Sequence, residues 1–199
     1  ERRGVPQVVD ARGEAVLREA HRLGVSAAHI TTARVYLVEA ALDERDADQV
    51  LSQLLIDPVK ESGIEGAEPA HPSDIVIEVH PLPGVMDPAA RTVEEAVAEL
   101  LARPQSSVRV STGWRFDIAG GTMEGALQLA TQSLANSVIE HIHTEPWAPD
   151  ALPRGTPADQ TLRHVTLRNV TDEQLMALSA RGHLFLNLTE MRAIQGHFV

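Results

Sequence analysis

Three histidines are the first residues of this chain whose type and spacing could do chemistry. His141 and His143 lie two residues apart in a segment that reads as a strand, so they share one face. Paired imidazoles can bind a metal, but a structural site needs about four ligands. In the strand order argued below, His80 should pair away from His143, and no Asp or Glu is evident beside them. We therefore predict a surface pair of histidines and no metal-binding residues.

Catalytic and phosphate-binding patterns are missing as well. Ser, His and Asp all occur, but there is no G-x-S-x-G elbow, and neither His164 nor His183 has a suitably spaced partner. The stretch AGGTMEG at 119–125 lacks both the G-x-G-x-x-G and the Walker lysine pattern, and the only lysine of the chain is Lys60. We read it as a helix entry, and we predict no catalytic and no cofactor-binding residues.

Charged residues offer one further candidate. Arg109 and Arg115 lie on either side of Gly113, where they could dock an acidic partner or pair with Glu inside the fold. We favour the second interpretation. The acidic runs at 43–48 and 94–95 lie near predicted helix starts, where negative charge is favourable, and should face solvent.

Composition limits the class of protein. The 199 residues are 43% hydrophobic and carry a net charge of −11, with no run of Lys and Arg that could contact nucleic acid or an anionic membrane. Cys is absent, which excludes disulfides and thiolate sites and fits a reducing compartment. No apolar run approaches the roughly 18 residues of a membrane span, and the N-terminus has no apolar signal core. We expect a soluble cytoplasmic protein.

Several blocks of the sequence occur twice in the same order. PQVVDARG at 6–13 resembles PGVMDPAA at 83–90, residues 29–40 resemble 109–120, and residues 54–61 resemble 133–140. The second pair aligns Thr32 with Thr112 and Tyr36 with Phe116. The offset changes only from 77 to 80 and then 79, which predicts a tandem repeat.

Each repeat has the pattern of a ferredoxin-like unit. Apolar periodicity predicts helices at 11–23, 43–55, 123–134 and from Pro88 onward, with Asp10 and Asp87 as N-caps. Alternation predicts a strand at 74–82, and the blocks 29–40 and 109–120 read as two short strands each, bent near Ala33 and Gly113. Only ERRGV precedes the first loop, so the first strand of the first unit should be missing.

The predicted fold class is α+β: two tandem ferredoxin-like units packed sheet to sheet as a pseudo-dimer, followed by a small, mostly helical linker segment. The stacking follows because helices on one side of each sheet would leave a bare apolar face on the other. The expected division is 1–68, 69–150 and 151–199. In the last segment we predict a strand at 161–170, a helix with Thr171 and Gln174 as a capping box that stops at Gly182, and a helix from Thr189 that nothing closes. We expect the natural chain to continue past both ends.

The motifs resemble a known family. IEVHPLPGVMDPAA at 77–90, followed by VRVSTGWRFDI at 108–118, is similar to the small S subunit of phosphoribosylformylglycinamidine synthase, a purine-pathway amidotransferase. RVYLVEAALD with LLIDPVKE, and LANSVIE, resemble the tandem S-like units at the front of the large synthase subunit. Residues 178–198 resemble the linker before its catalytic domain. The residues that fill the second S-subunit motif are Val108, Arg109, Thr112, Gly113, Arg115 and Phe116.

The resemblance implies a non-catalytic assembly role in the ATP- and glutamine-dependent amidation of formylglycinamide ribonucleotide. The implied partners are the synthase domain of the same chain and a glutaminase, while ATP, Mg²⁺ and the catalytic segment belong to a domain beyond Val199. The alternative is a regulatory module that binds a small molecule between its two units, which would need convergent polar residues there. The lack of a nucleophile with its base argues against an independent hydrolase.

Overall fold

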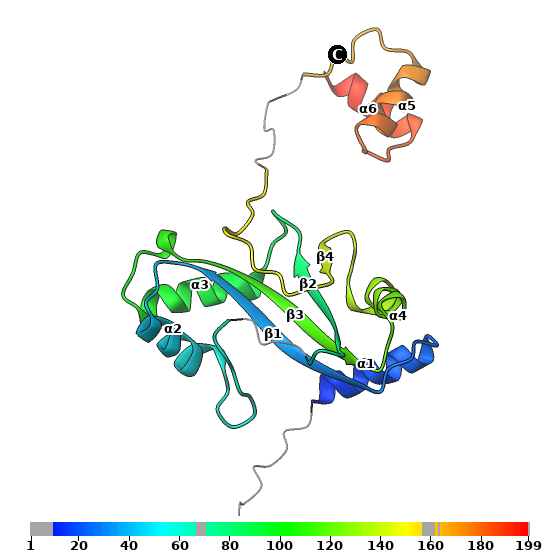
Figure 1. The fold of residues 1–199 in the computed structure, drawn as a ribbon. Coiled ribbons are helices and arrows are strands. Elements are labelled where there is room, and N and C mark those ends of the chain that lie inside the picture. The colour runs from blue at the N-terminus through cyan, green and yellow to red at the C-terminus, as the bar shows by residue number, and fades with distance from the viewer. Residues whose placement is uncertain (1–9, 67–70, 157–161, 163, 199) are drawn as a thin grey trace, which may run out of the picture. The chain divides into compact units, whose positions relative to one another are not determined.

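The computed structural model describes residues 10–66, 71–156, 162 and 164–198 (Figure 1). The chain divides into two compact units, Glu1–Thr156 and Pro157–Val199. Two predictions lie outside the described residues. They concern Pro6 and Val8 of the first repeat block, and residues 1–5, which we expected to be too short for a first strand.

The first unit is built on one four-stranded antiparallel sheet. Its strands are β1 (His29–Glu39), β2 (Ile75–Pro81), β3 (Arg109–Ala119) and β4 (Glu140–His143), in the spatial order β1-β3-β2-β4. The α+β class is confirmed. The predicted stacking of two sheets is wrong, because β1 and β3 pair edge to edge over their full length within a single sheet.

The two long strands are also straighter than expected. Instead of two short strands each, β1 and β3 run without a break through Ala33 and Gly113. These two residues lie within the continuous β1–β3 ladder, whose hydrogen bonds keep both chains extended. The predicted bends are therefore wrong.

The register of this ladder matches the repeat found in the sequence. Thr32 lies opposite Phe116, and Tyr36 lies opposite Thr112. When each residue is replaced by its equivalent in the other repeat, the first pair becomes the second. The same equivalence relates Arg34 to Trp114, which face each other at the centre.

The predicted helices of this unit are all present. They are α1 (Ala11–Arg22), α2 (Glu44–Val50), α3 (Pro88–Leu100) and α4 (Met123–Leu129), with a short 3-10 turn at Gln105–Ser107. Helices α2 and α4 each continue as a π-helical turn, Leu51–Leu55 and Ala130–Leu134. The N-cap predictions for Asp10 and Asp87 are confirmed, and Thr122 caps the helix that follows the glycines of 119–121.

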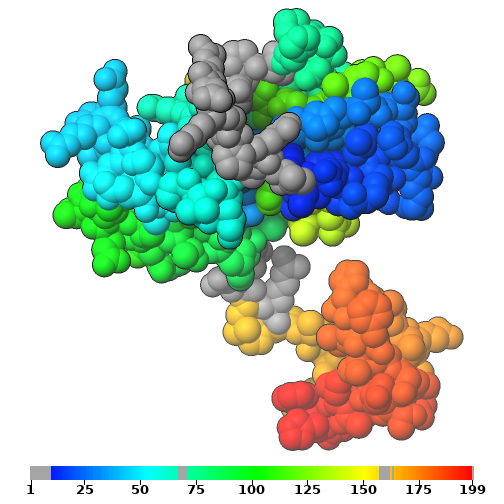
Figure 2. Space-filling view, turned by 90° about the horizontal axis from the view of Figure 1, so that it is seen from below, coloured from blue at the N-terminus to red at the C-terminus, as the bar shows by residue number. Residues whose placement is uncertain are grey.

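The helices pack on one face of the sheet over two apolar clusters, with α1 and α2 on opposite sides of the view in Figure 2. One cluster joins α1 to α4, the other α2 to α3, so residues from both predicted repeats build each core. The buried members are Ala20, Val25, Ala27, Ile30, Ile77, Val79, Phe116, Ile118, Ala126, Leu129 and Ala130 in the first cluster, and Val50, Ala90, Val97, Ala98, Val108 and Val110 in the second.

The other face of the sheet is polar, not apolar as predicted. Alternation along β2 and β3 places Glu78, His80 and Arg115 there, all of them buried. The segment 144–155, which we call the strap, lies on this face and hydrogen-bonds to it at Glu78 and at Glu39. A polar face that the strap partly covers does not need a second sheet.

The second unit consists of α5 (Asp172–Arg181) and α6 (Leu188–Phe198). The capping box of Thr171 and Gln174 is confirmed, as is the helix end at Gly182. The strand predicted at 161–170 is wrong, since the described residues there form coil and a turn, and the described part of this unit contains no strand for them to pair with. Among the described residues, no helix is long and apolar enough to cross a membrane.

Candidate functional site

The loop PGVMDP leads into α3, and its carboxylate is fully engaged in the fold. Asp87 Oδ1 accepts the helix-capping hydrogen bond from Ala90 N at 2.9 Å. Its Oδ2 accepts from the backbone N of Thr112 at 3.0 Å and from Thr112 Oγ1 at 2.9 Å. Asp87 thus joins the start of α3 to β3 beyond the end of the β2 pairing, where strand donors would lack partners. The carboxylate has an architectural role.

Asp10 makes the same set of contacts in the first half. It accepts from Gly13 N at 2.7 Å, from Thr32 N at 2.6 Å and from Thr32 Oγ1 at 2.9 Å. The alignment of Thr32 with Thr112 in the sequence contained the signal for the bonds between threonine and aspartate. For Asp10 and Asp87 we had predicted only the helix caps.

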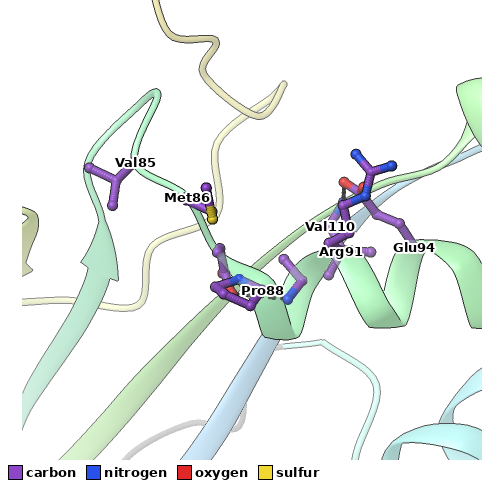
Figure 3. Close-up of a pocket in the computed structure, with 8 residues that line it drawn as sticks. Val85, Met86, Pro88, Arg91, Glu94 and Val110 are labelled. Atoms are coloured by element: carbon purple, nitrogen blue, oxygen red, sulfur yellow. Dashed lines mark hydrogen bonds between the residues drawn. The ribbon is translucent and has the colours of Figure 1, made fainter.

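An open hollow of about 460 Å³ lies beside the loop, lined by its last residues, the first turns of α3 and one residue of β3 (Figure 3). Most of the lining is apolar, and Met86 at its rim is 85% exposed. Glu94, expected to face solvent, accepts a hydrogen bond from Val110 N at 2.9 Å and so protects another β3 edge donor. The lining residues are Val85, Met86, Asp87, Pro88, Ala90, Arg91, Glu94 and Val110.

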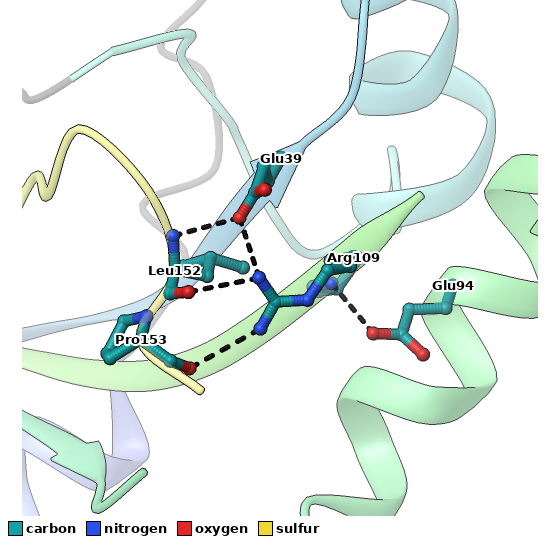
Figure 4. A network of polar contacts seen from close by, with 6 residues as sticks. Glu39, Glu94, Arg109, Leu152 and Pro153 are labelled. Atoms are coloured by element: carbon teal, nitrogen blue, oxygen red, sulfur yellow. Dashed lines mark hydrogen bonds and ion pairs between the residues drawn. The ribbon is translucent and has the colours of Figure 1, made fainter. Parts of the chain in front are cut away.

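Arg109 fastens the strap to the long strands (Figure 4). Its guanidinium lies 2.9 Å from Glu39 Oε2 and donates to the carbonyl oxygens of Leu152 at 3.0 Å and Pro153 at 3.3 Å. Glu39 Oε2 also accepts from Leu152 N at 2.9 Å. The interpretation of Arg109 as a structural residue paired with Glu agrees with this geometry.

A second hollow, about 280 Å³, separates the strap from the PGVMDP loop. Arg109, Ser111 and Trp147 contribute to its lining. At its edge Gly84 and Gly155 approach so closely that a Cβ built on Gly155 would lie 2.6 Å from the Gly84 Cα. Only a residue without a side chain fits there, so the loop and the strap keep a direct backbone contact.

The histidines form a cluster with Glu78 and Trp147 under the strap. His80 Nε2 lies 2.9 Å from Glu78 Oε2, and the same oxygen accepts from Trp147 N at 3.0 Å. The ring of Trp147 lies 4.8 Å from that of His80 and is stacked on His143 at 4.9 Å. His80 pairs with His141 near the start of β4 and not with His143, as predicted. The expected distance between His80 and His143 is wrong, because their ring centroids are only 5.6 Å apart.

The electrostatics of this cluster favour neutral imidazole at His143. Burial lowers the pKa of His143, and the neighbouring charges of His141 and His80 lower it further, against opposing contributions from Glu78 and Glu145. Within the ranges that the structure describes, no three His, Asp or Glu side chains are arranged to hold a metal ion. The histidines, Glu78 and Trp147 form a polar cluster beneath the strap, and this cluster contains no nucleophile paired with a base.

The other predicted candidates are dispersed. Arg115 pairs with Asp117 at 2.9 Å, two residues along the same strand. His164 and His183 belong to the second unit. Sequence reasoning missed Glu39, Glu78 and Trp147, because their roles depend on where the strap crosses the sheet.

Comparison with known proteins covers the part of the chain that carries the loop and β2–β4. No curated protein matches the sequence. Residues 74–146 match the family model of PurS, described as phosphoribosylformylglycinamidine (FGAM) synthase. This match links the segment from β2 to the start of the strap with the small subunit of that synthase and with purine biosynthesis.

Proposed function

We propose that this chain is a non-catalytic assembly region at the front of the large subunit of FGAM synthase. In this role it supports the docking of a glutaminase and of the synthase domain, so that ammonia released from glutamine reaches formylglycinamide ribonucleotide. ATP and Mg²⁺ act in the synthase domain, and the setting is cytoplasmic. The match of residues 74–146 to PurS is the observation that carries the proposal.

The contacts of the matched segment fit an architectural role. The carboxylates of Asp87 and Glu94 accept backbone donors, and Arg109 holds the strap. A residue committed to such contacts is poorly placed to react with a substrate. The chain by itself should therefore show no ATP turnover with formylglycinamide ribonucleotide and ammonia.

The proposal includes a pseudo-dimer of two S-like repeats, 1–68 and 69–150, with 151–199 as the linker segment. The symmetric β1–β3 register and the pairwise equivalence of the two apolar clusters support it. In this arrangement the repeats share one sheet edge to edge.

Docking can be tested at the rim of the larger hollow, in the full-length synthase that contains this chain. We expect Met86→Glu to reduce glutamine-dependent turnover at least tenfold and to leave ammonia-dependent turnover within twofold. A charge on an exposed apolar residue should weaken a protein contact without unfolding the chain. Val59→Glu is the matched control, because Val59 is 82% exposed and Met86 is 85% exposed.

Equal loss of both activities in Met86→Glu, with an unchanged melting temperature, would contradict the proposal. So would equal effects of Met86→Glu and Val59→Glu. The alternative is a regulatory module that binds a small molecule between its repeats. It is supported by the group of Arg12, Arg34 and Trp114, which lies where the two repeats meet.

A further inference from the structure

Two arginines stack on one tryptophan where the two apolar clusters meet. The Cζ of Arg12, in the first turn of α1, lies 3.6 Å from the Trp114 ring centroid. The Cζ of Arg34, the cross-strand partner of Trp114, lies 5.0 Å from the same centroid and 5.7 Å from the ring of Tyr36. Trp114 packs against the first cluster and Tyr36 against the second, so the group lies at the seam between them.

The group has many donors and no acceptor for them. In the described part of the chain, neither Arg12 nor Arg34 makes an ion pair or a hydrogen bond, although the protein carries a net charge of −11. Asp10 is the nearby carboxylate, but its oxygens already accept from Gly13 and Thr32. Two cations are held on one ring without an anion between them.

This arrangement costs electrostatic free energy. Burial lowers the pKa of Arg12, the charge of Arg34 lowers it further, and Asp10 opposes both. Both Arg12 and Arg34 are exposed, so an anion from solution can reach the two guanidiniums. An anion shared by both guanidiniums relieves the repulsion, and each planar fork can donate two parallel hydrogen bonds to neighbouring oxygens.

We propose that Arg12, Arg34 and Trp114 form a binding site for the phosphate group of a small phosphate monoester. A phosphate monoester carries close to two negative charges at neutral pH and at least three acceptor oxygens, which matches two guanidinium forks better than a single carboxylate does. Trp114 fixes both arginines by stacking and thereby reduces the entropy lost on binding. The site goes beyond the assembly role and does not depend on it.

The test is a titration of the 199-residue chain with inorganic phosphate and with ribose 5-phosphate, at constant ionic strength set with chloride. NMR follows the indole N–H signals of Trp114 and Trp147 and the side-chain Nε–H signals of the arginines. We expect saturating shifts at Trp114, Arg12 and Arg34, with Trp147 unaffected. Arg12→Gln and Arg34→Gln should each weaken binding at least tenfold, and Arg34→Lys should recover only part of it.

Arg18→Gln is the matched control, because Arg18 is exposed on the same helix, as Arg12 is, but contacts no aromatic ring among the described residues. Shifts that do not saturate, or an equal loss of binding in Arg18→Gln, would overturn the site. Tighter binding of malonate than of either phosphate compound would overturn the assignment to phosphate. The dispersion of the amide spectrum shows whether each variant is folded, and a Trp114→Phe variant that keeps full affinity would contradict the role of the indole.

Discussion

The segments that follow α2 and α4 begin identically and end differently. After α2, Asp57 N donates to Glu61 Oε2 at 2.9 Å, and Val59 N donates to Asp57 Oδ1 at 2.9 Å. After α4, Asn136 N donates to Glu140 Oε2 at 2.7 Å, and Val138 N donates to Asn136 Oδ1 at 3.1 Å. The same local hydrogen bonds therefore close both turns.

The chain beyond these turns depends on its neighbours. Glu140 starts β4, which pairs with β2, whereas residues 61–64 remain coil. Among the described residues, nothing equivalent to β2 lies beside β1 for residues 61–64 to join. A turn needs only its own residues, but a strand needs a partner with free backbone groups. The comparison therefore separates what each repeat encodes locally from what the sheet supplies.

The largest difference between the halves should appear at the centre of the long strands. A Cβ on Gly113 would lie 2.3 Å from Cε1 of His80, which is buried and cannot move aside. Gly113→Ala should cost about 1–3 kcal/mol of unfolding free energy, as overpacking does. Denaturant unfolding of the first unit measures the loss.

Ala33, the equivalent residue of β1, is the control for this substitution. It is exposed, so Ala33→Gly should cost only about 0.5–1 kcal/mol through the greater backbone freedom of glycine. Unchanged stability of Gly113→Ala would mean that the histidine cluster is loosely packed.

The two capping aspartates should behave alike. Asp87→Ala and Asp10→Ala each remove a helix cap and leave the N–H of Thr112 or Thr32 without its acceptor, so each should cost about 1–2 kcal/mol. The ratio of the two losses, measured by denaturant unfolding, tests the equivalence of the halves. A loss at Asp10 several-fold smaller than at Asp87 would indicate that the first half is frayed.

Much of the fold could be predicted because local chemistry determines it. Asp10, Asp87 and Thr171 cap helices through residues close in sequence, and the apolar period of each helix is clear. The pairing of β1 with β3 was missed, although Glu78, His80 and Arg115 at alternate positions of β2 and β3 already argue against an apolar face for a second sheet. The false strand at 161–170 shows a different limit, since alternation gives no sheet where the described residues offer no neighbouring strand.

The site was less predictable than the fold. Glu78 is 3% exposed on a strand whose sequence reads as apolar, and its partner Trp147 lies 69 residues away in a proline-rich stretch that reads as a linker. Buried polar residues that depend on such distant contacts carry no short-range pattern. A proline-rich segment can still be ordered when side chains such as Arg109 donate hydrogen bonds to its carbonyl oxygens.

The smallest expected effect is a pH dependence of stability that is confined to the second half. There His143 of β4 corresponds to Ile64 of the first half. Because the pKa of folded His143 is lowered by burial and by His141 and His80, the unfolded chain takes up this proton first, near its ordinary value of 6.5. Above that pH both states are neutral and the group has no effect. Below it, acidification favours unfolding until the folded state is protonated too.

Hydrogen exchange at pH 7.5 and 5.5 should therefore show faster opening of the β2–β4 pair at the lower pH, with the β1–β3 ladder less affected. His143→Gln should remove part of this acceleration, because glutamine does not titrate. An equal acceleration in both ladders, unchanged by His143→Gln, would place the titrating group elsewhere and end the distinction between the halves on this point.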